Sequence, residues 1–253
     1  MEKRNTAMLA LAISFALTVN LTVDLTGKSP ALALSSQEEQ TLNSWKLTAS
    51  SSALGQVLLS VLSDCNHKLA INSLNGEAYF KRGYLYGVVG CTNSALNDLS
   101  RAIEISPYDS RFYTERALCY IDLKSYDKAL NDLNKAIALK PANGNALLAR
   151  GRLWLLQGKA LMAIGDLRCC QNADVQFRSE LPGEYAANHY NAPAYYLGQC
   201  YETLGRNSDA IFFYKEALKA GQGGSVGYVH RWADQPIDTK YRVSMLQLEG
   251  GQP

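Results

Sequence analysis

A nine-residue pattern that recurs every 34 residues constrains the fold of this chain more than any other feature. The pattern reads Ala-Leu-Asn-Asp-Leu-Ser-Arg-Ala-Ile from Ala95 and Ala-Leu-Asn-Asp-Leu-Asn-Lys-Ala-Ile from Ala129. A looser copy begins at Ala163 and a more distant one at Val61. A fixed period of this length is typical of an array of helical hairpins in which each unit contacts its neighbours. Such an array predicts a docking surface rather than a catalytic centre.

Composition and charge narrow the range of partners. The chain has 253 residues, 47% apolar and 19% charged, with a formal net charge of +2 at pH 7. This length is enough to stack several small repeats around a continuous core. The charge is too small for a nucleic-acid electrostatic footprint, and no stretch concentrates Lys and Arg among aromatic residues. We therefore do not expect nucleic acid as a partner.

The N-terminal segment has the pattern of a targeting signal. Basic residues precede an apolar run over 8–23, and Ala-Leu-Ala from Ala31 offers the small residues that a signal peptidase accepts. We expect a signal peptide over 1–33, cleaved before Leu34, and hence an exported protein. The compartment would be periplasmic or extracellular, and the thylakoid lumen is equally reasonable in a host with thylakoids.

A retained membrane anchor is the alternative for the same segment. The apolar run contains Asn20 and is followed by Asp24, which makes it a poorer spanning helix than a signal-peptide core. In the anchored alternative the chain would be a membrane-attached scaffold of an envelope complex, and only then would a membrane be a partner.

Each 34-residue unit has the small-residue pattern of two antiparallel helices. A small residue recurs in the first helix, and alanines recur in the second, so that the two helices can approach closely. The first-helix positions are Gly83, Ala117, Gly151 and Gly198. Pro107 and Pro141 follow second helices, because proline cannot continue a helical ladder.

These recurring positions resemble the tetratricopeptide repeat, which pairs a small residue with a later aromatic residue and ends with alanines and a proline. The resemblance implies an all-α, right-handed superhelical solenoid of antiparallel helix pairs. Its units would be a degenerate N-terminal capping repeat over 42–75 and four repeats over 76–109, 110–143, 144–177 and 191–224. The remaining segments would be a flexible lead-in over 34–41, an insertion loop over 178–190 and a C-terminal capping segment or tail over 225–253.

Arginine and aspartate recur together in three repeats, and both are replaced in the fourth. The arginines are Arg82, Arg116 and Arg150, and the aspartates are Asp98, Asp132 and Asp166, whereas Leu197 and Phe213 occupy the two positions in the last repeat. Joint loss is expected of a charge-paired slot, because a half-buried Arg without its carboxylate is costly. We interpret the pairs as contacts within the scaffold, with a ligand clamp as the alternative. Asp64, whose own unit lacks the arginine, could instead pair with Arg82.

The family's pattern places one surface of the first helices on the inside of the curve, where a peptide or protein partner would bind. The surface is largely apolar and aromatic, with two arginines available for a carboxylate. It comprises Glu77, Phe80, Tyr84, Val88, Arg111, Thr114, Leu118, Ile121, Asn145, Leu148, Arg152, Leu155, Tyr195, Gln199 and Glu202. It lacks the Lys and Asn combination of the domains that clamp chaperone C-termini. Alternatively, Leu118, Leu148 and Leu155 pack between neighbouring helices.

The six cysteines permit disulfides but do not demand them. An even number in an exported chain allows pairing, and the pairs worth testing are Cys65 with Cys91, and Cys169 or Cys170 with Cys200. Helical repeats do not need such cross-links, and free cysteines are commonly buried. No Cys-x-x-Cys spacing occurs, so we expect neither a metal nor another cofactor.

Catalytic motifs are missing from the sequence. There are only three histidines, and neither a zinc-binding histidine pair, nor a nucleophile elbow, nor a phosphate-cradling glycine loop occurs. We expect a non-catalytic interaction scaffold or adaptor. The alternative is an enzyme or enzyme accessory that uses the 171–190 insertion, where His189 lies near Glu184 and Tyr190.

Overall fold

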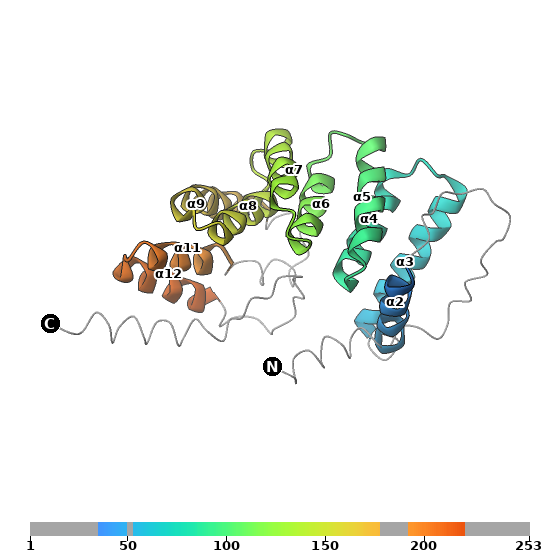
Figure 1. Cartoon of the computed structure of the whole chain (residues 1–253), viewed down its shortest axis with the longest axis horizontal. Coiled ribbons are helices and arrows are strands. Elements are labelled where there is room, and N and C mark those ends of the chain that lie inside the picture. Colours follow the sequence, from blue (N-terminus) through green and yellow to red (C-terminus); the bar gives the residue numbers. More distant parts are fainter. Residues whose placement is uncertain (1–34, 50–52, 178–191, 221–253) are drawn as a thin grey trace. The chain divides into compact units, whose positions relative to one another are not determined.

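The computed structural model describes residues 35–49, 53–177 and 192–220, and helices are the only regular secondary structure in these residues. Within each of the compact units given below, helices that are consecutive in the sequence pack against one another (Figure 1). The predicted all-α class is therefore confirmed. The predicted signal peptide, the 178–190 insertion and the 225–253 segment lie outside the described residues. The chain divides into two compact units, Met1–Leu123 and Lys124–Pro253, and each is described by itself.

The first unit contains five described helices. They are α2 (Ser36–Ala49), α3 (Ala53–Ile71), α4 (Gly76–Val89), α5 (Thr92–Ile105) and α6 (Ser110–Asp122). Leu42 and Trp45 of α2 are buried with Leu62, Leu85 and Cys91 in one apolar cluster. Burial of these side chains explains why α2 is helical from Ser36, within the stretch that the sequence predicted to be a flexible lead-in.

The second unit also contains five described helices. They are α7 (Tyr126–Leu139), α8 (Gly144–Leu156), α9 (Ala160–Phe177), α11 (Ala192–Thr203) and α12 (Asn207–Ala220). One of its core clusters joins Trp154 of α8, Leu167 of α9, Leu197 and Tyr201 of α11, and Tyr214 of α12. This cluster packs the last two helical pairs of the described chain together.

The first helices begin at a repeated cap. Asn75, Asp109 and Asn143 precede α4, α6 and α8, and the side chain of each accepts a hydrogen bond from a backbone N–H of the first turn. A short polar side chain at this position satisfies one of the N–H groups that a helix start leaves without an intrahelical partner. The 34-residue period is therefore visible in the helix boundaries as well as in the core.

The small-residue column sets how closely paired helices approach. A Cβ placed on Gly83 would lie 3.0 Å from Leu99, and one on Gly151 would lie 2.9 Å from Leu167. The contact is closest at Gly198, where a Cβ would lie 2.5 Å from the Tyr214 ring. Tyr214 occupies the position that leucine holds in the other repeats, so the bulkiest second-helix residue faces the position least able to accept a side chain.

Candidate functional site

The predicted partner-binding surface of the first unit consists of residues from α4 and α6, and part of it is buried. Thr114 is only 2% exposed, and its hydroxyl donates a hydrogen bond to the Ser110 carbonyl at 2.9 Å. Ile121 is also buried, whereas Tyr84 keeps 38% of its surface exposed. Phe80 stacks on Phe112 with ring centroids 4.9 Å apart. In this unit, Phe80 of the predicted surface therefore packs α4 on α6, and Thr114 and Ile121 are withdrawn from the surface.

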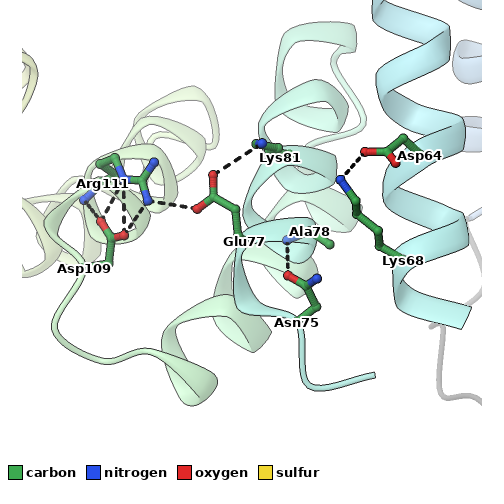
Figure 2. Close-up of polar contacts among 8 residues, drawn as sticks. All are labelled: Asp64, Lys68, Asn75, Glu77, Ala78, Lys81, Asp109 and Arg111. Carbon is green, nitrogen blue, oxygen red and sulfur yellow. Dashed lines mark hydrogen bonds and ion pairs between the residues drawn. The ribbon is translucent and has the colours of Figure 1, made fainter. Parts of the chain in front are cut away.

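Arg111 is held in place by acidic side chains of its own unit (Figure 2). Its Nη2 lies 2.7 Å from Asp109 Oδ2 and 2.9 Å from Glu77 Oε2, and Glu77 also lies 3.7 Å from Lys81 Nζ. The guanidinium additionally lies over the Phe80 ring, 5.0 Å from its centroid. Hydrogen bonding to Asp109, reinforced by Glu77, raises the pKa of Arg111.

These contacts change the role expected of Arg111. The sequence predicted a cation available to a partner's carboxylate, but Asp109 and Glu77 already supply two carboxylates. Because α6 starts at Ser110, Arg111 occupies its first turn and reaches across to α4. The described geometry makes Arg111 a link between neighbouring first helices.

The second unit contains a pocket between α8 and α11. Its volume is about 600 Å³, and its wall includes four residues of the predicted surface: Arg152, Leu155, Gln199 and Glu202. Leu156, Tyr196 and Thr203 complete the wall and were not predicted. The family pattern selects positions on one face of each helix, whereas these three lie beside that face. Leu156 and Thr203 are exposed in the C-terminal turns of α8 and α11, whereas Tyr196 is buried in the first half of α11. The repeat pattern encodes neither placement.

The remaining predicted residues of this unit lie outside the pocket wall. Asn145 is exposed, and Leu148 packs against the core clusters of the unit, as the packing alternative proposed. Tyr195 packs edge-on against Tyr196, with ring centroids 5.5 Å apart. Leu155 serves two purposes, because it contacts the core cluster and also lines the pocket.

Neighbouring side chains hold the polar groups of the pocket in position. The Arg152 guanidinium lies over the Tyr196 ring, 6.0 Å from its centroid. The Tyr214 hydroxyl donates a hydrogen bond to Glu202 Oε2 from within the core. Gln199 Nε2 donates to the Tyr195 hydroxyl at 3.0 Å. The pocket therefore presents one cation, one anion and one amide, each with a defined orientation.

Two of the three predicted Arg–Asp pairs are confirmed. Arg82 contacts both carboxylate oxygens of Asp98, at 2.7 and 2.8 Å, and Arg150 contacts both oxygens of Asp166 at 2.7 Å. Both arginines are therefore paired with carboxylates of their own repeat, as contacts within the scaffold. Arg116 and Asp132 belong to different units, so their pairing stays a prediction. The suggested contact of Asp64 with Arg82 is wrong, because Asp64 pairs with Lys68 at 2.7 Å.

The same arginines have a second set of partners that sequence reasoning missed. Each donates from Nη1 to a polar residue 16 positions earlier, in the preceding second helix. The partners are Asn66 for Arg82 at 2.9 Å, Ser100 for Arg116 at 3.2 Å and Asn134 for Arg150 at 2.7 Å. These positions are themselves 34 residues apart, which was the signal that could have identified them.

All six cysteines lie in the described part of the chain and are free thiols. Five of them are buried, and Cys169 is exposed. The two pairings that the sequence suggested for testing are not formed.

Within residues 35–49, 53–177 and 192–220, no group of three or more Asp, Glu, His or Cys side chains is arranged to hold a metal ion. The same residues include no helix with the length and apolarity needed to cross a membrane.

Comparison with known families identifies tetratricopeptide repeats in two segments. Models described as "Tetratricopeptide repeat" match residues 110–143 and 193–220. The first segment spans α6 and α7, and the second spans α11 and α12. No curated protein sequence matches the chain.

Solved structures show the same fold at low sequence identity. The structure of PilF from Pseudomonas aeruginosa is similar, with a TM-score of 0.57 and 18% identity, over 69% of this chain and 68% of that one. TTC0263, a tetratricopeptide-repeat protein of Thermus thermophilus, gives 0.55 and 19% over 83% and 99%. MamA gives 0.51 and 19% over 64% and 86%. These likenesses confirm the predicted tetratricopeptide-like class of fold.

Proposed function

We propose that this protein is an exported, non-catalytic adaptor that binds a peptide segment of a partner protein on its first helices. The observation that carries the proposal is the pocket between α8 and α11, whose wall includes Arg152, Leu155, Gln199 and Glu202 of the predicted surface. A concave site that combines apolar side chains with a few oriented polar groups is a common form of ligand site. The charges around Arg111 form a network with Asp109 and Glu77, and these residues are not part of the pocket wall.

The principal contact in this proposal is the exposed apolar wall of the pocket. Leu156 remains 54% exposed at the end of α8 and lines the pocket. An apolar side chain of a partner would displace water from this surface, at about 25 cal/mol for each Å² of apolar area that it buries. The proposal therefore predicts that partner binding depends on Leu156 more than on equally exposed leucines elsewhere.

A matched pair of variants tests this dependence. The full-length protein would be used to capture partners from the exported fraction of its own host, in parallel with Leu156→Ala and Leu161→Ala. Leu161 is 73% exposed at the start of α9 and is not part of the pocket wall. A partner that survives Leu161→Ala and is lost with Leu156→Ala supports the proposal. Identical capture by both variants would contradict it.

Export is a separate part of the proposal and has its own test. Its support is the basic start, the apolar run over 8–23 and the small residues from Ala31. The intact mass of the protein purified from its host distinguishes the alternatives. A chain that begins at Leu34 supports cleavage and export, whereas retention of residues 1–33 supports the anchored scaffold.

A further inference from the structure

The balance of charge in the α8–α11 pocket indicates the class of peptide that it accepts. Resting on the function proposed above, we propose that this pocket binds an uncharged, extended peptide segment through main-chain hydrogen bonds and one large apolar side chain. Acidic tails and basic tails are both disfavoured. The proposal deepens the docking function, because it specifies the chemistry of the partner.

Opposite charges in the wall exclude a strongly charged ligand. Arg152 contributes a cation and Glu202 an anion to the same pocket, and no other charged side chain of the described residues lines it. An acidic segment that approached Arg152 would also approach the Glu202 carboxylate, and a basic segment would meet Arg152 in the same way. Placing like charges together in an interface suppresses the wrong partner. The net charge of the wall favours a ligand of net charge near zero.

The polar groups match the alternating donors and acceptors of a peptide main chain. Each residue of an extended segment offers one N–H and one carbonyl oxygen. The Arg152 guanidinium can donate to a carbonyl, and the Glu202 carboxylate can accept from an N–H. A side-chain amide carries two N–H donors and one acceptor, so Gln199 can serve a ligand while it donates to the Tyr195 hydroxyl. Together, these three side chains offer both donors and acceptors to the main chain of an extended peptide.

Core residues behind the wall fix the acceptor in position. Tyr214 is fully buried and donates its hydroxyl to Glu202. Its ring lies against Gly198, where even a Cβ would be 2.5 Å away, so the phenol has little freedom to move. An acceptor that is already oriented loses less conformational entropy when it binds a ligand. Tyr214 is thus a positioning residue for the pocket.

The apolar part of the wall provides the specificity for a side chain. Leu155, Leu156 and Tyr196 line the pocket together. The Tyr196 ring is held on one side by Tyr195, at a centroid distance of 5.5 Å, and on another by the Arg152 guanidinium. A rigid aromatic ring and aliphatic side chains in one pocket wall suit an aromatic or branched aliphatic residue of the ligand.

Selection from a displayed library of random seven-residue peptides on the full-length protein tests the proposal. A selected peptide counts as a pocket ligand if it binds the Leu156→Ala variant more weakly than the wild type and binds the Leu161→Ala variant as tightly as the wild type. The expected binders have a net charge near zero and contain a large apolar residue. Their affinities should change less than about threefold between about 50 and 500 mM salt, since screening acts on charged contacts. Acidic or basic binders with steep salt dependence would overturn the charge-balance inference and leave the docking function intact.

Two further variants separate the role of Glu202 from a general loss of structure. Tyr214→Phe keeps the ring over Gly198 but removes the hydroxyl that orients Glu202. It should weaken binding of the selected peptides by less than about tenfold, the upper range for loss of one direct hydrogen bond. Glu202→Gln keeps an acceptor but leaves Arg152 without the balancing charge in the wall. Selection on Glu202→Gln should therefore enrich acidic peptides, and an unchanged set of peptides would contradict the proposal. If no peptide depends on Leu156, the docking function at this pocket fails as well.

Discussion

Arg150 and Asp166 meet in a two-point contact, with Nε to Oδ2 and Nη2 to Oδ1 both at 2.7 Å. The two side chains are only 22% and 11% exposed. The same arginine donates from Nη1 to Asn134 of the preceding second helix. A single side chain of α8 is thus bonded to both α7 and α9, and the guanidinium links adjacent repeats of the second unit.

Removing one member of this pair should be far more damaging than removing both. Arg150→Met leaves Asp166 buried without its cation, at an expected cost of about 3–5 kcal/mol in the free energy of unfolding. The double variant Arg150→Met, Asp166→Leu should recover most of that loss, because the last repeat fills the same positions with Leu197 and Phe213. Urea denaturation of both variants and of Asp166→Leu alone measures the coupling. Additive losses would show that the pair is not a unit.

The repeat fold was predictable because its determinants are periodic. The 34-residue recurrence of small residues, alanines and aspartates reports the spacing of paired helices, and the Arg82–Asp98 and Arg150–Asp166 pairs follow from it. Helix starts at Asn75, Asp109 and Asn143 carry the same period. Local features of this kind depend on neighbours at fixed sequence separations, so a single sequence is sufficient to find them.

The candidate site was less predictable because it depends on departures from the period. The pattern placed Arg111 and Arg152 in equivalent roles, yet Asp109 and Glu77 pair with the first, while the second lies over Tyr196 in a pocket wall. The Tyr214–Glu202 hydrogen bond arises from a leucine-to-tyrosine change in the second helix of a single repeat. The effect of such a difference depends on which side chains are in contact. A comparison of equivalent positions in the repeats does not show those contacts.

Gly198 and Gly165 should respond in opposite ways to the same substitution. Gly198→Ala places a Cβ 2.5 Å from the buried Tyr214 ring, and overpacking of this kind costs about 1–3 kcal/mol. Gly165 lies in the interior of α9, and a Cβ there would meet no atom within 4 Å. Gly165→Ala should therefore raise stability by about 0.5–1 kcal/mol through the helix preference of alanine. Thermal unfolding of both variants makes the comparison. Equal shifts in the same direction would contradict the close approach at Gly198.

Thiol labelling should distinguish Cys169 from the other cysteines. Burial raises the pKa of Cys91 to about 11 and that of Cys200 to about 12, so both remain protonated near neutral pH. The thiolate is the reactive form, and Cys169 is the exposed cysteine. Alkylation of the native protein at pH 7.5, a value chosen at about one unit below an ordinary thiol pKa, should modify Cys169 first. Peptide mass mapping identifies the site, and Cys169→Ser is the control. Rapid labelling of Cys91 in the folded protein would show that its thiol is accessible.

Acid should release the contact that attaches α2 to α5. Glu38 Oε1 accepts from the Ser94 backbone N–H at 3.0 Å, and Glu38 Oε2 accepts from the Ser35 hydroxyl at 2.9 Å. Burial acts to raise the pKa of Glu38, but the Ser94 and Ser35 hydrogen bonds outweigh it and hold the pKa below 4.5. A lowered carboxylate pKa gives stability that is present above the unfolded-state pKa and is lost as pH falls through the folded-state value.

The variant Glu38→Gln should therefore reduce stability at pH 7 and have little effect once the wild-type carboxylate is protonated. Urea unfolding of both proteins, measured from pH 7 down to about 3, which lies below an ordinary glutamate pKa of about 4.3, gives the difference at each pH. The neighbouring variant Glu39→Gln is the matched control, because Glu39 is exposed. A Glu38→Gln deficit that stays constant across this range would show that the charge of Glu38 does not stabilise the attachment of α2. A deficit that closes as Glu38 protonates would establish α2 as an acid-sensitive part of the first unit.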